Sequence, residues 1–435
     1  MSKIRFGSFF QEQFHLLIDL ARWIPIASMA GVMAGSASAL LLVSLDLATD
    51  LREAHRWLIL LLAPAGLLVG YLYKCFGSSV EAGNNLILEE VHDPKAVIPA
   101  RMTPLILFGT FITHLFGGSA GREGTAIQTG ASLADQLSKP LHLSPRDRRV
   151  LLMSGISAGF ASVFGTPLAG SVFGIEVLTF GNLSYDAIAP CFIAAFIGDL
   201  VTKAWGIHHT IFTISEAPPL RIGGIVSSIV AGMIFGLVAM GFAKMTHTVS
   251  QISRSLIPSA PFRPFFGGIV VTLAVLLLGT TKYIGLGIPT IVASFYEKLP
   301  PYDFAIKSIL TALTLGTGFK GGEVTPLFFI GSTLGNALSR ILPLPSSLLA
   351  GMGFVAVFSG AANTPIASTL MAVELFGAEA GAYAGIACVI SYLFSGHSGI
   401  YHAQRVGRSK HLRATGEEGL SLALVAKARE SDTSH

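Results

Sequence analysis

The sequence predicts an all-α integral membrane protein, and three observations lead to that fold class. Hydrophobic residues make up 51% of the 435 residues and charged residues only 12%, and the mean hydropathy is +0.65. A typical soluble domain has about 25% charged residues, so this chain cannot cover a water-facing surface. Apolar stretches also recur along the whole chain. Since a spanning helix needs about 20 apolar residues, the chain has room for many passes.

The apolar stretches define the expected helices in chain order. The polar, amphipathic start of the chain lacks a signal-peptide cleavage pattern and is expected to form a cytoplasmic surface helix. Longer apolar stretches then lie at 26–48, 57–73, 186–205, 222–242, 267–279 and 355–376. Others, such as 104–117 and 310–318, are short and interrupted by glycine or proline. Short, broken segments are typical of half-helices that end inside a membrane.

An internal repeat divides the chain into two related halves. The motif GTPLA in the first half and NTPIA in the second each place a glutamate, Glu176 or Glu374, nine residues after the proline. A glycine-rich segment with a lone acid, Glu123 or Glu323, precedes these glutamates by 53 and 51 residues. Repeats of this kind place the binding site between the two halves. The expected divisions are a surface helix at 1–20, a transmembrane transport domain at 21–410 with repeat halves at about 20–215 and 218–405, and a short polar cytoplasmic tail at 411–435.

The basic residues indicate orientation, because cytoplasmic loops carry an excess of lysine and arginine. They gather before the first span, in the loop 139–149, and at 405–410, so all three segments are expected inside the cell. The net charge of +4 has no long basic run, so no nucleic-acid partner is expected. The three cysteines show neither disulfide nor metal-ligand spacing, and neither a cofactor nor a metal is expected.

The segment GGSAGREGT contains the first candidate site residue. Arg122 and Glu123 are the only fully charged side chains between Pro104 and Ala134, and an ionisable residue at membrane depth is a functional candidate. Glycines before a helix start expose N–H groups that favour negative charge. An ionised glutamate there can occupy an anion site and leave it when protonated, as a proton-linked gate. The alternative is an ion pair of Arg122 with Glu123 at the membrane surface.

The segment GTGFKGGEVTPL repeats this design in the second half. Glu323 is the only acid between Ser308 and Ser339, and Pro326 suits the first turn of a helix. Two such helix starts that face each other near the middle of the membrane would offer amide donors to an anion. The alternative for Glu323 is a structural acid that pairs with Lys320.

Two other patterns have structural interpretations. Glu176 and Glu374 each end an apolar run and are expected to cap or pair at helix ends. The residues GGSAG fit G-x-S-x-G, the nucleophile-elbow pattern of hydrolases, with His114 the only nearby histidine. The preceding residues are helical in pattern, so Ser119 is interpreted as a packing residue. No enzymatic activity and no catalytic residue are expected.

These motifs resemble those of the CLC family of chloride channels and transporters. GREGT at 121–125 is similar to the family's GREGP, GGEVTP at 321–326 to its GGxFxP, and GIYHAQ supplies its late tyrosine. The resemblance covers about residues 25–410. It implies a CLC-like fold of tilted and broken helices in two inverted-topology repeats, with one ion pathway per subunit of a homodimer. It implies the following roles: Glu123 as the external gate, and Gly124, the amides of Glu323 and Val324, and the Tyr401 hydroxyl as anion-binding groups.

Departures from the family pattern resemble its fluoride-exporting branch. The family's GSGIP, whose serine binds chloride, is replaced by GNNLI at 83–87, which puts Asn84 at the serine position. Fluoride holds its water tightly, and an asparagine NH₂ offers two donors where serine offers one. The Thr325 hydroxyl adds a donor, and a protonated Glu323 could donate or relay a proton. Val177 stands where chloride/proton exchangers have a second glutamate, so protons from inside need another route.

The expected function is therefore fluoride export by exchange with protons. The protein is expected to be a multi-pass protein of the plasma (inner) membrane. Its expected partners are fluoride, protons, the bilayer and a second copy of the chain. The alternatives are a chloride or nitrate/proton exchanger of the same fold and a passive anion channel. The chain has no room for the C-terminal CBS domains of many eukaryotic relatives, which favours a prokaryotic origin.

Overall fold

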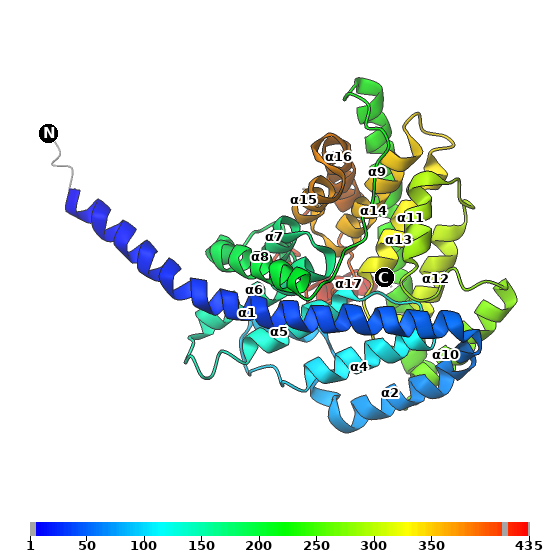
Figure 1. Ribbon diagram of the computed structural model, residues 1–435, viewed down its shortest axis with the longest axis horizontal. Coiled ribbons are helices and arrows are strands. Elements are labelled where there is room, and N and C mark those ends of the chain that lie inside the picture. Colours follow the sequence, from blue (N-terminus) through cyan, green and yellow to red (C-terminus); the bar gives the residue numbers. More distant parts are fainter. Residues whose placement is uncertain (1–5, 411–415, 434–435) are drawn as a thin grey trace.

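The computed structural model describes residues 6–410 and 416–433, and this part of the chain is helical apart from two short strands (Figure 1). The all-α prediction is confirmed. The α-helices are α1 Phe6–Ala54, α2 Leu62–Phe76, α3 Asn84–His92, α4 Met102–Leu115, α5 Glu123–Asp135, α6 Pro145–Phe164, α7 Pro167–Glu176, α8 Ile188–Ala204, α9 Ile222–Leu256, α10 Phe262–Leu278, α11 Ile288–Tyr296, α12 Asp303–Gly316, α13 Val324–Leu338, α14 Ser346–Ala362, α15 Pro365–Phe376, α16 Ala378–Phe394 and α17 Leu422–Thr433. The strands are β1 Thr179–Phe180 and β2 Arg405–Val406, which pair in parallel, and the 3-10 helices are η1 Arg56–Leu61, η2 Ser78–Val80 and η3 Tyr185–Ala187.

The described helices differ widely in length, as expected for a membrane protein with broken segments. Four helical segments are long and apolar enough to cross a bilayer, at 13–54, 56–76, 185–204 and 222–256. Several others are apolar but have only 10–17 residues. Helix α1 has no break at residue 20, so the surface helix predicted for 1–20 is continuous with the first span, and the first turns of α1 project beyond the other helices (Figure 1).

The two halves build equivalent packed pairs of helices. In the second half, α13 crosses α14 so closely that a β-carbon on Gly331 or Gly353 would lie 2.0 Å from the other residue's carbonyl oxygen. In the first half, α5 crosses α6 in the same way at Gly130 and Gly155. Small residues permit this approach where no hydrophobic force drives helices together in lipid. The crossings fix α5 and α13, which start at the two glycine-rich segments.

Each of the two repeated glutamates caps the start of a helix in the other repeat. Glu374, near the end of α15, accepts hydrogen bonds from the N–H groups of Leu168 and Ala169 in the first turn of α7, at 2.9 and 2.8 Å. Glu176, at the end of α7, accepts them from the first turn of α15 at 3.0 and 2.8 Å. A helix start leaves N–H groups without partners and favours negative charge. The interpretation of these acids as capping residues is confirmed, and the caps connect the halves.

The basic segments within the described residues gather on one face. The Arg22 guanidinium forms an ion pair of 2.8 Å with Asp147 in the basic loop. From the same loop, Arg149 donates to the Ser184 hydroxyl at 3.0 Å, close to β1. Strand β1 in turn pairs with β2, which begins at Arg405. This arrangement agrees with the predicted orientation, although Lys3 and Arg5 lie outside the described residues.

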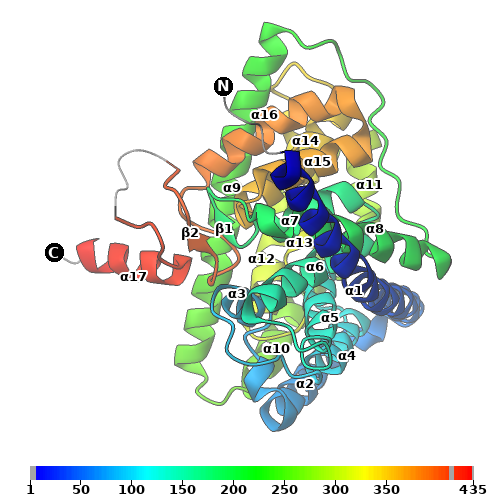
Figure 2. The ribbon, with the colours of Figure 1, turned by 90° about the vertical axis from the view of Figure 1, so that its left-hand side faces the viewer.

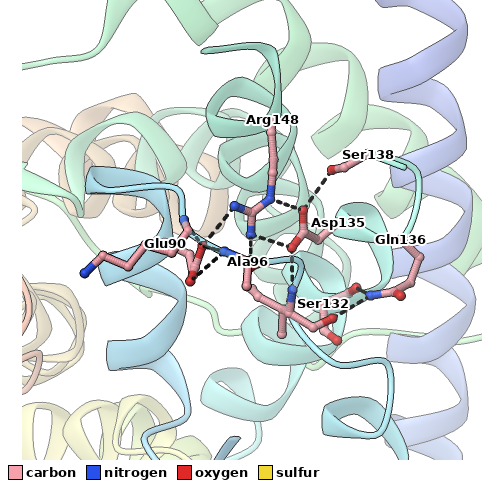
Figure 3. Close-up of polar contacts among 9 residues, drawn as sticks. Glu90, Ala96, Ser132, Asp135, Gln136, Ser138 and Arg148 are labelled. Atoms are coloured by element: carbon pink, nitrogen blue, oxygen red, sulfur yellow. Dashed lines mark hydrogen bonds and ion pairs between the residues drawn. The ribbon is translucent and has the colours of Figure 1, made fainter. Parts of the chain in front are cut away.

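A buried arginine joins the ends of three helices on that face (Figure 3). Arg148 in α6 donates from Nε and Nη2 to the Asp135 carboxylate at 2.7 and 2.8 Å, and from Nη1 to Glu90 at 2.9 Å. Its Nη2 also donates to the Ala96 carbonyl oxygen at 2.6 Å. Asp135 ends α5 and Glu90 lies near the end of α3. The network therefore holds together the helices that start with Glu123 and Asn84.

The tail returns to the body of the protein. Helix α17 lies beside β2 (Figure 2), where Leu422 and Val425 pack against Phe180 and Val406. Thr433 is the last residue described in it, and residues 411–415 and 434–435 of the predicted tail lie outside the described residues.

Candidate anion site

The two glycine-rich segments meet, as the sequence predicts. The Gly121 N–H donates to the Gly322 carbonyl oxygen at 2.6 Å, and the Gly322 N–H donates to the Gly121 carbonyl oxygen at 2.9 Å. These two hydrogen bonds form an isolated antiparallel bridge. Immediately after it, α5 begins at Glu123 and α13 at Val324. Two helix N-termini thus converge inside the protein, which is an arrangement that favours an anion.

The Glu123 carboxylate occupies this point of convergence. Its side chain is fully buried and accepts a hydrogen bond of 2.9 Å from the Thr325 N–H and another from the Thr325 hydroxyl. The Arg122 N–H donates to the same carboxylate at 3.1 Å. The Arg122 Nε lies 3.8 Å from Glu123 Oε1. The ion pair of the alternative interpretation therefore exists, but it lies inside the protein.

Glu323 takes a different position from its counterpart. It is the N-cap residue of α13, so its carbonyl accepts the Leu327 N–H at 3.0 Å. Its side chain is partly exposed and lines a cavity. Among the described residues Glu323 has no ion pair with Lys320, whose ammonium instead lies 3.9 Å from the centre of the Tyr73 ring. The pairing considered for these two residues is wrong.

That cavity, here called the Tyr401 cavity, has a volume of about 140 Å³. Two of its polar atoms, Asn84 Oδ1 and Tyr401 Oη, are buried without a hydrogen-bond partner among the described residues. Buried polar groups are normally satisfied, so these two mark the place where a bound species would lie. The lining residues are Tyr73, Val80, Glu81, Ala82, Gly83, Asn84, Asn85, Ile106, Gln128, Leu315, Phe319, Lys320, Gly321, Glu323, Ile400 and Tyr401.

The structure distinguishes Asn84 from the asparagine beside it. Asn85 Oδ1 accepts the Ala403 N–H at 3.0 Å and so holds the Tyr401 loop against α3. Asn84 makes no such bond, and its NH₂ group lies against Gly124, where a β-carbon would approach Nδ2 to 3.1 Å. Gly124 is therefore a position of close approach. Val324 is the first residue of α13, so its N–H has no partner within the helix.

A second cavity, here called the His209 cavity, lies on the other side of the Glu123 carboxylate. It is small, about 30 Å³, and is lined by Arg122, Glu123, Val163, Phe164, His209, Thr210, Phe212, Ile288, Ile291, Thr325, Phe328, Phe354 and Leu375. His209 belongs to the loop after α8. Glu123 and Thr325 line only this cavity, and Asn84, Glu323 and Tyr401 line only the other. The contact between Glu123 and Thr325 therefore borders the His209 cavity and is not part of the lining of the Tyr401 cavity.

Some contacts of the site were not foreseen from the sequence. The Thr125 hydroxyl, which distinguishes GREGT from GREGP, shares a hydrogen bond of 2.6 Å with Thr110 in α4. Gln128, one turn after Gly124, lines the Tyr401 cavity. Ser119 donates to the Tyr283 carbonyl oxygen at 2.9 Å, and its hydroxyl also lies 2.9 Å from the Thr311 hydroxyl. No local sequence pattern predicts these partners. A polar residue in an apolar stretch indicates only that some hydrogen-bond partner is required.

The described residues offer no metal site, because they contain no group of three or more His, Cys, Asp or Glu side chains that could hold an ion.

Comparison with known proteins places this arrangement in a family. Residues 65–396 match the family described as voltage gated chloride channel. The chain belongs to this family, the CLC family. A chloride/fluoride channel protein of Pseudomonas syringae pv. tomato is 55% identical to it over 413 residues, covering 94% of this chain and 91% of the relative.

Solved CLC structures have the same fold. The crystal structure of a CLC-type fluoride/proton antiporter superposes with a TM-score of 0.87 at 35% identity, covering 89% of this chain and 99% of that one. A slow cyanobacterial Cl⁻/H⁺ antiporter superposes with a TM-score of 0.77 at 18% identity and covers 94% of this chain and 98% of that one. The predicted CLC-like architecture is confirmed.

Proposed function

We propose that this CLC protein exports fluoride in exchange for protons, with one anion pathway in each subunit. The observation that carries the proposal is the Glu123 carboxylate, which is buried between two cavities and accepts three hydrogen bonds. A carboxylate in that place holds donors that an anion would otherwise use. The similarity to a chloride/fluoride channel protein and to a fluoride/proton antiporter supports fluoride as the anion.

Exchange follows from competition for the same donors. Ionised Glu123 is held by charge-assisted hydrogen bonds, which are about twice as strong as neutral ones. When Glu123 takes a proton from the His209 cavity, these bonds weaken and the side chain can leave. Fluoride from the Tyr401 cavity, after passing Asn84 and Tyr401, then accepts from the Thr325 N–H and hydroxyl. The carboxyl then releases its proton toward the Tyr401 cavity, and return of the ionised carboxylate displaces the fluoride toward the His209 cavity, so the proton and the anion move in opposite directions.

Fluoride places special demands on the donors. It is small and strongly hydrated, so the site must replace its water with close hydrogen bonds. Thr325 supplies two donors, Asn84 an NH₂ group and Tyr401 a hydroxyl. A protonated Glu323 adds another donor at the inner end of the path. Because Val177 follows Glu176 and Glu176 is used as a cap, the transported proton has to reach the inside past Glu323 or by movement of Glu123.

The deciding experiment replaces the gate. Glu123→Gln has the same shape but cannot ionise, so a pH gradient should no longer drive fluoride through liposomes containing the variant. Fluoride and pH electrodes measure both fluxes. Glu53→Gln, an exposed acid at the end of α1, is the matched control and should keep coupling. Proton-coupled fluoride flux in Glu123→Gln at the wild-type level would refute the assignment of the gate.

A second candidate is chloride/proton exchange, since the printed name of the Pseudomonas relative includes chloride as well as fluoride. The same liposomes, loaded with chloride instead of fluoride, distinguish the two. A passive channel is distinguished by its failure to move either anion against its gradient when a pH gradient is imposed.

We also propose that the subunits pair as homodimers in the plasma (inner) membrane with the basic face in the cytoplasm. The gathering of Arg22, Arg149 and Arg405 on one face supports the orientation, and the resemblance to the family supports the dimer. Cross-linking of the purified protein in detergent and in bilayers tests the pairing.

A further inference from the structure

One cation of the Tyr401 cavity has no role in the exchange described above. Lys320 follows Phe319 in the loop between α12 and α13 and lines the cavity together with Glu323 and Tyr401. Its side chain is only partly exposed. Among the described residues it makes neither an ion pair nor a hydrogen bond, and its one contact with a polar or aromatic group is the Tyr73 ring at 3.9 Å.

Residues of α4 and α2 position the Lys320 side chain. A β-carbon on Gly109 in α4 would lie 2.8 Å from Lys320 Cγ, so the glycine lets the aliphatic stem pass across the helix. The ammonium then lies over the face of Tyr73 in α2, where a cation is attracted by the ring. The stem passes Gly109 of α4, the ammonium lies over Tyr73 of α2, and the residue lines the Tyr401 cavity.

The ammonium keeps hydrogen-bonding capacity that the described residues do not use. It has three N–H donors and no acceptor, and an aromatic face engages only one side of it. The acids that line the cavity are Glu81, which is exposed, and Glu323, and among the described residues neither forms an ion pair with Lys320. Arg254, in the last turn of α9, adds positive charge that acts on Lys320. A partly desolvated cation of this kind attracts small anions.

We propose that Lys320 forms an anion-docking subsite in the Tyr401 cavity, between water and the Asn84–Tyr401 site, and that a small inorganic anion, here fluoride, binds it before reaching Thr325. The proposal rests on the proposed function and adds a step to it. Docking at Lys320 raises the local anion concentration without changing the exchange at Glu123. The subsite thus increases affinity for cytoplasmic fluoride and leaves the maximal rate unaltered.

The test separates affinity from rate. Initial fluoride efflux is measured from liposomes loaded with a series of fluoride concentrations, for wild type and for Lys320→Met, which keeps the stem and removes the charge. We expect KM for fluoride to rise about tenfold at unchanged kcat, which corresponds to about 1.4 kcal/mol. Lys320→Arg should stay within about twofold of wild type. Raising the concentration of an inert salt should shrink the difference, because salt screens the charge.

Controls make each outcome decisive. Lys427→Met removes an exposed charge on α17, far from the cavity lining, and should change neither constant. If Lys320→Met does not fold, Lys320→Gln serves in its place. An unchanged KM, or a lower kcat at unchanged KM, overturns the docking subsite while wild-type transport still supports the proposed function. Absence of fluoride transport by wild type overturns the proposed function itself.

Discussion

Asn84 and Asn85 are adjacent at the start of α3, and the two side chains make different contacts. Asn85 is bound to the Ala403 N–H, whereas Asn84 Oδ1 is without a partner in the described structure and the residue faces the Tyr401 cavity. The sequence alone placed the anion-binding asparagine only by similarity to a serine in the family motif. Asn85 Oδ1 is already used to hold Ala403, which supports Asn84 as the proposed anion-binding residue.

The first prediction concerns selectivity at this residue. Asn84→Ser replaces two N–H donors by one hydroxyl, and a hydrogen bond to a charged group contributes about 1.5 to 3 kcal/mol. The ratio of fluoride to chloride transport should therefore fall about tenfold, as measured with ion-selective electrodes on liposomes. Asn85→Ser should lower the thermal stability and leave the ratio nearly unchanged. Equal ratios in wild type and Asn84→Ser would remove Asn84 from the selectivity mechanism.

At the scale of elements, helices are held by polar contacts at their ends as well as by packing along their sides. The Arg148 network joins the ends of α3 and α5, whose starts carry Asn84 and Glu123 (Figure 3). A helix is stiff over such lengths, so fixing one end also fixes the other. Glu176 and Glu374 do the same between the repeats, at the starts of α15 and α7.

The second prediction is that Arg148→Met strongly destabilises the protein. It leaves the carboxylates of Asp135 and Glu90 buried without their partner, and breaking a buried ion pair in this way costs about 3 to 5 kcal/mol. Thermal unfolding in detergent measures the effect. Arg146→Met, an exposed residue of the same helical turn, should change the unfolding free energy by no more than about 0.5 kcal/mol. Similar melting of both variants would show that the network adds little.

The third prediction separates capping from proton transfer. Glu176→Gln keeps one carbonyl oxygen but loses the charge at the start of α15, so it should destabilise the protein by about 1 to 3 kcal/mol. Proton coupling should remain, because the carboxylate serves Ile366 and Ala367 rather than a proton path. Liposome flux and thermal unfolding together test this. Loss of coupling in a stable Glu176→Gln variant would assign Glu176 to the proton route.

At the scale of the whole molecule, the proposed exchange requires that one group, Glu123, alternates between the Tyr401 cavity and the His209 cavity. Asn84, Glu323 and Tyr401 line the Tyr401 cavity, and the Glu123–Thr325 contact borders the His209 cavity. A pathway of this form permits coupled exchange, in which the energy of one gradient moves the other ion.

The fourth prediction follows from that coupling. With the membrane voltage set to zero and an inward proton gradient of one pH unit, each proton releases about 1.4 kcal/mol. For exchange of one proton for one fluoride, the protein should move fluoride outward until its gradient is about tenfold. A fluoride electrode outside proteoliposomes of known internal concentration records this. Equilibration without accumulation would identify a passive channel instead.

The sequence by itself determined the class of the protein and much of its site. Low charge and recurring apolar stretches required a membrane, because no soluble surface could be built from them. The glycine-rich segments with solitary Glu123 and Glu323 marked two helix starts, since backbone freedom and charge at a helix start are local properties. The repeated spacing to Glu176 and Glu374 indicated two halves, and family motifs added Asn84, Val324, Thr325 and Tyr401.

Only the tertiary structure decided which groups touch. Thr325 lies 202 residues from Glu123 in the chain, and no local pattern shows that the two share a hydrogen bond. The same is true of Arg148 with Glu90, and of Lys320, for which Glu323 was the alternative partner and whose ammonium lies over the Tyr73 ring. Local sequence sets where helices start and which faces are apolar, whereas contacts between distant side chains depend on the path of the whole chain and on close crossings such as Gly331 with Gly353.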